Sequence, residues 1–81
     1  MKVRVKLFAV ARQRIGRDTL EIELPDQPTI RHLRASLIEH FPALADIVTH
    51  SRLAIDNEYA TDTFPIPPIA EIALIPPVSG G

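Results

Sequence analysis

Two stretches near the start of the chain alternate between hydrophobic and polar side chains, at about residues 2–8 and residues 18–24. The hydrophobic positions are Val3, Val5, Leu7, Leu20, Ile22 and Leu24. A period of two with one apolar side is typical of a half-buried β-strand. The polar side of the first strand is basic and that of the second is largely acidic, which favours an antiparallel pair. Between them, Gly16 is suited to end a short helical turn at residues 9–15 in the left-handed conformation.

Residues 30–41 have the spacing of one long amphipathic helix. Hydrophobic residues recur there three and four positions apart, at Ile30, Leu33, Leu37 and Phe41. Thr29 is a good N-cap, because its hydroxyl is able to accept a hydrogen bond from a free N–H of the first turn. Pro42 should end the helix, because the residue before a proline avoids the α conformation. A further helical turn is expected at residues 43–49.

The last third of the chain predicts two short strands and then a central strand. The short strands are expected at residues 52–55 and 59–60, on either side of a turn. The prolines of residues 64–68 exclude a central strand there and indicate a loop or a sheet edge. Residues 69–75 form a nearly continuous hydrophobic run, which predicts a strand buried on both faces in the middle of the sheet. The order of elements indicates an α+β fold, a small sheet with one long helix packed across it.

The composition is that of one ordinary globular domain. The chain has 81 residues, of which 46% are hydrophobic and 23% are charged, and a chain of this size is able to bury a modest core. The absence of cysteine excludes a disulfide scaffold, a thiolate nucleophile and a cysteine-type zinc site. A net charge of −1 gives nucleic acid little reason to bind. The sequence shows no signal peptide and no long apolar run, so we expect a cytoplasmic protein with no membrane partner.

Residues that usually carry chemistry are few and scattered. Three glycines leave no phosphate-binding loop, and the serines lack the context of a nucleophile elbow. His32, His40 and His50 are too few and too poorly spaced for a catalytic metal site, so we expect no metal and no permanently bound cofactor. Basic residues near the start form either a steering patch for an acidic partner or a solvated sheet face. They are Lys2, Arg4, Lys6, Arg12, Arg14 and Arg17.

The sequence given ends in Gly80-Gly81, which follow Pro76-Pro77-Val78-Ser79. Two residues without Cβ fill no core, but they suit a tail that enters a narrow channel, and the prolines keep its approach extended. The alternative is a frayed terminus. In the first interpretation the α-carboxylate of Gly81 is the reactive group. It is ionised at neutral pH and needs activation by another protein. Adenylation by ATP, followed by attack of a persulfide or thiol, would give a thiocarboxylate or a thioester.

Both ends of the chain resemble the family of molybdopterin synthase small subunits, which are sulfur carriers. The opening Lys6-Leu7-Phe8-Ala9, followed by Arg12 and Ile15-Gly16, looks like the start of this family, and the segment from Ile75 to Gly81 resembles its ending. The resemblance implies a β-grasp (ubiquitin-like) roll with a mixed sheet, in which the first and last strands are adjacent and parallel. It also implies a β-grasp domain at residues 1–75 and a flexible Gly-Gly tail at residues 76–81.

The same resemblance implies that a ubiquitin-activating-type adenylyltransferase uses ATP to adenylate Gly81, and that a sulfurtransferase supplies the sulfur of a C-terminal thiocarboxylate. The tail would insert into the large catalytic subunit, where the sulfur passes to cyclic pyranopterin monophosphate in molybdenum cofactor biosynthesis. The chain is then a non-catalytic sulfur donor, with the catalytic residues on the large subunit. The expected tail and partner-binding residues are Phe8, Pro76, Pro77, Val78, Ser79 and Gly80.

Other functions remain compatible with the same tail. They are sulfur donation for the thiazole of thiamine or for tRNA thiolation, a protein modifier joined through Gly81, and a ubiquitin-like interaction module. One segment departs from the family, which commonly has an acidic turn before the last strand, where this chain has Pro67-Pro68-Ile69-Ala70. We therefore expect an exposed apolar loop that includes Ile66 and Ile69 and contributes to a partner surface.

Overall fold

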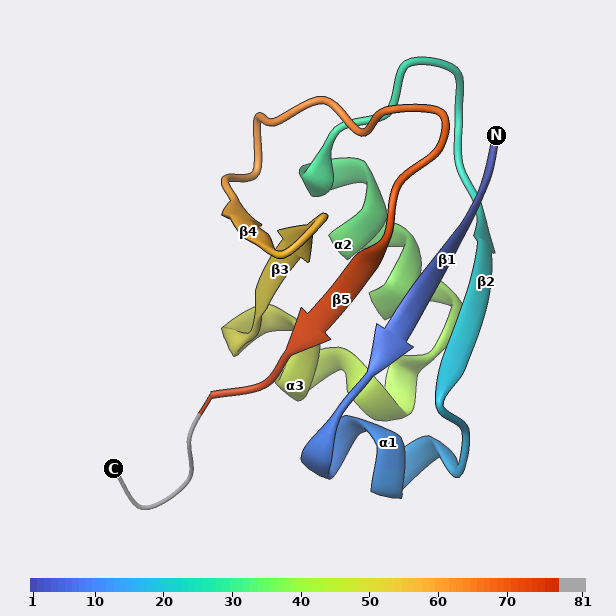
Figure 1. The fold of residues 1–81 in the computed structure, drawn as a ribbon. Coiled ribbons are helices and arrows are strands. Elements are labelled where there is room, and N and C mark those ends of the chain that lie inside the picture. The colour runs from blue at the N-terminus through green and yellow to red at the C-terminus, as the bar shows by residue number, and fades with distance from the viewer. Residues whose placement is uncertain (78–81) are drawn as a thin grey trace.

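The computed structural model describes residues 1–77 and has one five-stranded mixed sheet at its centre (Figure 1). The strands lie in the order β2-β1-β5-β3-β4. They are β1 (Lys2–Leu7), β2 (Thr19–Glu23), β3 (Arg52–Ile55), β4 (Glu58–Ala60) and β5 (Ile72–Ile75). β1 pairs antiparallel with β2 and parallel with β5, whereas β3 pairs antiparallel with both β4 and β5. The prediction that the first and last strands are adjacent and parallel is therefore confirmed.

In the part of the chain that the structure describes, the helices that follow β2 lie on one side of the sheet, the first helix lies at the end of β1, and the other side of the sheet is uncovered (Figure 1). The helices are α1 (Ala9–Ile15), α2 (Ile30–His40), the 3-10 turn η1 (Pro42–Leu44) and α3 (Ala45–His50). α2 is the long helix that the sequence predicts, and the helical turn expected after it is found as η1 and α3. The arrangement is an α+β fold of two layers, in which α2 packs on the sheet through its buried face.

The hydrophobic core lies between the sheet and α2. Alternate residues of β1 and β2 point into it, so that Val5 and Leu20 are fully buried. From the helix side, Leu33 and Leu37 have no exposed surface. This alternation of buried and exposed residues is the one that the period of two in the sequence predicts.

Local signals in the sequence set several boundaries. Gly16 closes α1 with φ = 79°, in the left-handed conformation that the sequence predicts for it. Thr29 precedes α2, where its backbone N–H donates a hydrogen bond to Nδ1 of His32 at 2.9 Å in a capping box. Asp56 and Asn57 have φ of 49° and 71°, which suits the tight turn between β3 and β4.

Two expectations about the segment before β5 are wrong. The strand starts at Ile72 rather than at residue 69, and it is buried on one face only, because Ala73 and Ile75 are partly exposed. Ile66 is not on an exposed loop with Ile69. Its N–H donates to the carbonyl of Pro28 at 2.9 Å, and this contact holds Ile66 in the core at 5% exposure, whereas Ile69 is 92% exposed.

Candidate functional site

The uncovered face of the sheet has small residues at its centre. Lys6 of β1 lies opposite Ala73 of β5, Ala73 lies opposite Ala54 of β3, and Ala54 lies opposite Tyr59 of β4. Side chains of directly opposite residues lie side by side on one face of a sheet. The two alanines between larger neighbours therefore leave a shallow floor in the middle of this row.

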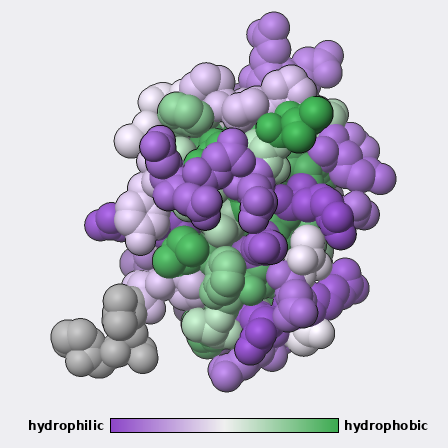
Figure 2. Space-filling view, in the orientation of Figure 1, coloured by the Kyte–Doolittle hydropathy of each residue, from purple (hydrophilic) through white to green (hydrophobic). Residues whose placement is uncertain are grey.

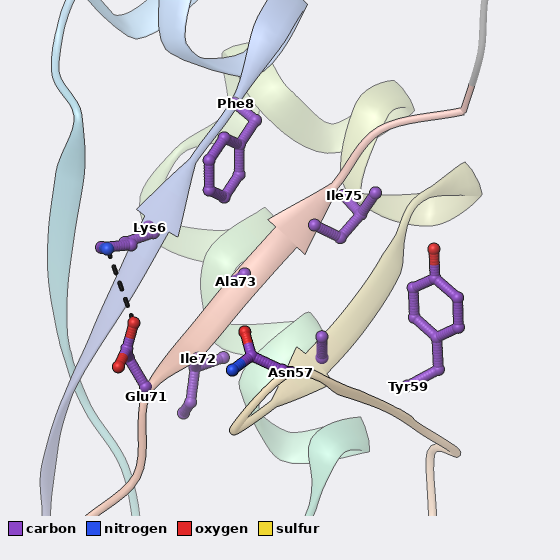
Figure 3. Close-up of a pocket in the computed structure, with 9 residues that line it drawn as sticks. Lys6, Phe8, Asn57, Tyr59, Glu71, Ile72, Ala73 and Ile75 are labelled. Atoms are coloured by element: carbon purple, nitrogen blue, oxygen red, sulfur yellow. Dashed lines mark hydrogen bonds and ion pairs between the residues drawn. The ribbon is translucent and has the colours of Figure 1, made fainter.

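This floor belongs to a depression of about 290 Å³, which we call the alanine hollow. Figure 3 shows Phe8, Ile75 and Tyr59 standing around it, and these three side chains form its apolar walls. Its lining residues are Lys6, Phe8, Ala54, Asn57, Tyr59, Glu71, Ile72, Ala73 and Ile75. Apolar walls and a polar rim are the features of a site that binds another molecule rather than of a plain solvated face.

An ion pair and two hydrogen bonds form the polar rim. Nζ of Lys6 lies 3.5 Å from Oε1 of Glu71, with both side chains largely exposed (Figure 3). The backbone N–H of Glu71 donates to Oδ1 of Asp56 at 3.0 Å, and the N–H of Asp56 donates to the carbonyl of Glu71 at 2.8 Å. These contacts tie the start of β5 to the turn between β3 and β4, so the hollow has a fixed shape.

Phe8, which the resemblance predicts as a partner-binding residue, lines the alanine hollow. It directly follows β1 and is 44% exposed, a large exposed fraction for an aromatic side chain. Ala9, the next residue, has φ = 50°. A left-handed conformation costs a non-glycine residue roughly 1–2 kcal/mol. The chain thus holds a strained backbone immediately after Phe8, and strain of this kind is often found at functional sites.

Next to the alanine hollow lies a second depression, of about 420 Å³, at the point where the chain leaves β5. We call it the proline groove. It is lined by His50, Arg52, Tyr59, Ile75, Pro76 and Pro77. The guanidinium carbon of Arg52 lies 5.0 Å from the centre of the Tyr59 ring. Among the predicted tail residues, the structure describes Pro76 and Pro77, whereas Val78, Ser79, Gly80 and Gly81 lie outside the described residues.

Figure 2 views the uncovered face and shows hydrophobic surface on its lower part, beside the end of β5. The exposed hydrophobic residues that follow β1 are Phe8 and Val10, at 44% and 39% exposure. Hydrophilic surface covers the middle of the same face in Figure 2. A partner that covers the hydrophobic part therefore also meets the first residues of the tail.

Acidic residues of β2 form ion pairs with Arg4 of β1 and with the amino terminus. Nε of Arg4 lies 3.9 Å from Oε2 of Glu21, and the amino group of Met1 lies 3.2 Å from Oε2 of Glu23. The opposite charges that the sequence places on β1 and β2 do face each other. A solvated sheet face is thus a better description of this part than a basic steering patch. Exposed pairs of this kind contribute little to stability.

The sequence interpretation missed most of the site. Arg52, Tyr59 and the alanines of the floor are not among the predicted site residues. They come together only through the pairing of β3 with β4 and β5. The sequence carries one sign of the floor, because the small residue Ala73 stands between the larger Ile72 and Leu74. Within residues 1–77 the structure has no group of three or more potential metal ligands. No helix in this part of the chain is long and apolar enough to cross a membrane.

Comparisons with known proteins agree with this architecture. The ThiS family matches residues 5–81. A protein of Caenorhabditis briggsae described as "Molybdopterin synthase sulfur carrier subunit" is 39% identical over 83 residues, which cover 100% of this chain and 99% of that protein. The solved structure of SAMP1 from Haloferax volcanii has a TM-score of 0.85 and 26% identity, with 100% of both chains covered.

A further solved structure contains two protein subunits. It is the complex of subunits 1 and 2 of the molybdopterin-converting factor of Helicobacter pylori, and one of its chains matches this protein with a TM-score of 0.68. The identity is 23%, and the match covers 100% of this protein and 100% of that one chain. A likeness at this level of identity shows the fold alone.

Proposed function

Because the chain belongs to the ThiS family, we propose that it is the sulfur carrier subunit of a molybdopterin synthase. The structural observation that carries the proposal is the position of the alanine hollow next to the proline groove, where Pro76 and Pro77 follow β5 and begin the tail. A partner that covers the hollow is placed to receive the tail. The folded domain thus binds the partner, and the reactive group is the α-carboxylate of Gly81 at the end of the tail.

In this proposal the α-carboxylate of Gly81 attacks the α-phosphorus of ATP on an adenylyltransferase, which releases pyrophosphate and leaves an acyl adenylate. A persulfide from a sulfurtransferase then attacks the carbonyl carbon and displaces AMP. Cleavage of the sulfur–sulfur bond by a thiol reductant leaves the thiocarboxylate. Glycine suits each step, because no side chain hinders approach to the carbonyl.

The partner that accepts the sulfur is proposed to be the large catalytic subunit of the synthase. The description of the Caenorhabditis briggsae relative as a sulfur carrier subunit supports this partner, because a subunit works together with at least one other chain. The large subunit would place an apolar side chain in the alanine hollow, since Phe8, Ile75 and Tyr59 offer it three apolar walls. The tail would then enter the active site of the large subunit, which supplies the catalytic residues and binds cyclic pyranopterin monophosphate.

The relatives favour this function over the other carriers. The Caenorhabditis briggsae protein is described as a molybdopterin synthase subunit and is covered almost completely. A reconstitution of sulfur transfer from purified components distinguishes this function from the alternatives. These are sulfur donation for thiazole or tRNA and conjugation to other proteins. A cytoplasmic location and the absence of a bound cofactor stay predictions.

The test is sulfur transfer by the purified chain after it has been loaded with sulfur. The loaded chain is mixed with the large subunit and cyclic pyranopterin monophosphate, and the molybdopterin formed is measured. A variant with one alanine added after Gly81 should lose at least about 100-fold in rate, because a displacement of about 1 Å already costs that much in a positioned reaction. Its melting temperature should be unchanged.

Glu39→Ala is the control, because Glu39 is exposed on α2, on the side of the sheet opposite the alanine hollow. It should transfer sulfur at the normal rate. Full activity of the alanine-extended chain would contradict the proposed function. Conjugates of the normal chain with lysine side chains, in place of molybdopterin, would identify a protein modifier.

A further inference from the structure

We propose that the proline groove binds a carboxylate side chain of the protein that receives the tail, through the guanidinium of Arg52. This inference rests on the proposed function, because it assumes that a partner covers this end of the sheet. The partner would then make two contacts, an apolar one at the alanine hollow and a polar one beside Pro76 and Pro77, where the tail begins.

Arg52 lies beside the point where the chain leaves β5. It is the first residue of β3 and lies opposite Ile75, the last residue of β5. Its side chain is exposed, and its guanidinium carbon lies 5.0 Å from the centre of the Tyr59 ring. Contact with the ring restricts the guanidinium, whose N–H groups stay able to donate hydrogen bonds to a further partner.

The charge of Arg52 also favours an acidic partner. Five ion pairs are present in the part of the chain that the structure describes, and their cations are the Met1 amino group, Arg4, Lys6, Arg12 and Arg34. Arg52 takes part in none of these pairs, and it is the only lysine or arginine in residues 41–81. Among residues 1–77, the lining of the proline groove contains no aspartate or glutamate. A cation without an acid, in a concave site with apolar walls, is complementary to an acidic group on a partner.

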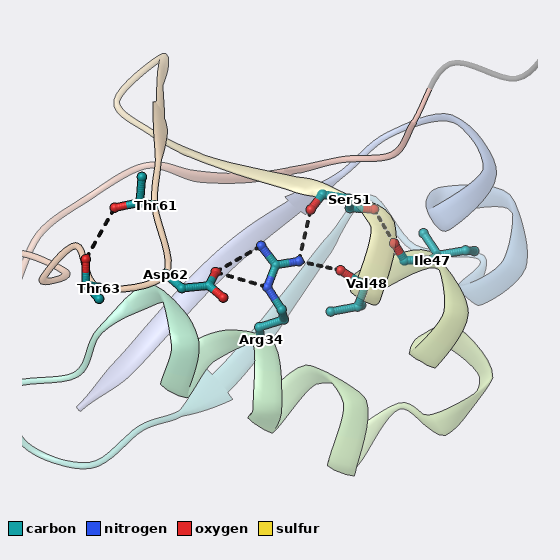
Figure 4. Close-up of polar contacts among 7 residues, drawn as sticks. All are labelled: Arg34, Ile47, Val48, Ser51, Thr61, Asp62 and Thr63. Carbon is teal, nitrogen blue, oxygen red and sulfur yellow. Dashed lines mark hydrogen bonds and ion pairs between the residues drawn. The ribbon is translucent and has the colours of Figure 1, made fainter. Parts of the chain in front are cut away.

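Arg34 fixes the segment that leads into β3 and so helps to position Arg52. Arg34 of α2 donates hydrogen bonds from Nη1 to the carbonyls of Val48 at 2.5 Å and Ser51 at 2.9 Å (Figure 4). Its Nε donates to Oδ1 of Asp62 at 3.3 Å. Ser51 is the residue immediately before Arg52. The base of the groove is therefore fixed before any partner binds, which lowers the entropy lost on association.

A carboxylate fits this groove better than a phosphate. The planar guanidinium matches a carboxylate with two parallel hydrogen bonds and neutralises its single charge. A phosphate group carries more charge and usually needs further donors. Pro76 and Pro77 have no backbone N–H, so their wall of the groove offers no such donors. We therefore commit to an aspartate or glutamate of the partner as the occupant.

The experiment measures the dissociation constant of the full-length chain and the large subunit for the normal chain, Arg52→Gln and Arg31→Gln. Arg31 is the matched control, because it is exposed on α2 and the change in charge is the same. Arg52→Gln should weaken binding by about tenfold or more in about 0.1 M salt. The difference should shrink towards 1 M salt, where the Debye length is about 3 Å instead of about 10 Å. Arg31→Gln should bind like the normal chain at both salt concentrations.

Three results would overturn the inference. If the normal chain binds the large subunit and Arg52→Gln binds equally well, the groove holds no carboxylate although the proposed function stands. If Arg52→Gln weakens binding equally at both salt concentrations, Arg52 acts by packing and not by an ion pair. If the normal chain itself does not bind the large subunit, the proposed function fails and the inference fails with it. Equal melting temperatures of the three chains exclude unfolding as a cause.

Discussion

The two faces of the sheet are built from alternate residues of the same strands, yet they have different tasks. In β5, Ile72 and Leu74 are buried against the helical layer, whereas Ala73 and Ile75 lie on the uncovered face. The covered face holds the fold together through apolar burial. The uncovered face carries a hollow and a groove whose lining residues, apart from Ala54 and Ile72, are not buried.

This division means that binding and stability should respond to different substitutions. Side chains alternate across a strand with a period of two, so a change at one position leaves its neighbours on their own face. Substitutions on the covered side should lower the free energy of unfolding. Those on the uncovered side should weaken a complex and leave the fold intact.

The sharpest comparison is between Ile66 and Ile69, which lie three residues apart. Ile66→Asp removes a buried side chain, which alone costs about 2–5 kcal/mol, and desolvation of the carboxylate adds to that cost. Ile69→Asp should change the free energy of unfolding by less than about 0.5 kcal/mol, because this side chain is exposed. Urea denaturation of both variants measures the difference. Equal stability of the two would show that Ile66 is not part of the core.

Phe8→Ala should affect binding rather than folding. Truncation of an aromatic residue at the centre of an interface typically costs about 2 kcal/mol or more, so the dissociation constant for the large subunit should rise by roughly 10-fold to 100-fold. Phe64→Ala is the control, since Phe64 is also 44% exposed but lies in the segment beside the start of α2. Equal binding by both variants would remove the alanine hollow from the interface.

A smaller effect is expected at the helix that covers the sheet. Thr29→Ala removes the capping residue of α2, whose hydroxyl lies 3.1 Å from Nδ1 of His32. The free energy of unfolding should fall by about 1 kcal/mol, while binding of the large subunit should not change. Thr63→Ala, in the loop after β4, should have no measurable effect on stability. An unchanged denaturation curve for Thr29→Ala would show that the cap does not stabilise α2.

Local patterns in the sequence predict most of the elements. The alternation in β1 and β2, the spacing in α2, Gly16 and Thr29 each depend on residues a few positions apart. These features are therefore readable without knowledge of the tertiary structure. The parallel pairing of β1 with β5 was inferred only from the resemblance to a family, because nothing local specifies contacts between residues so far apart in the chain.

The features that the sequence does not predict depend on contacts between segments far apart in the chain. The apolar run at residues 69–75 indicates a strand buried on both faces, but no element within residues 1–77 covers the side that carries Ala73 and Ile75. The inward position of Ile66 depends on its hydrogen bond with Pro28, which belongs to a distant segment. The alanine hollow and the contact of Arg52 with Tyr59 depend on the register of three strands, which hydrophobic periodicity alone does not specify.

The most direct test of the account concerns the carboxyl group of Gly81. The purified chain is incubated with ATP, the adenylyltransferase and a sulfur source, and its intact mass is then measured. The account predicts a mass increase equal to the replacement of one oxygen by one sulfur, located at Gly81 by fragmentation and absent without ATP. An unchanged mass in the complete mixture, or sulfur found on any other residue, would contradict it.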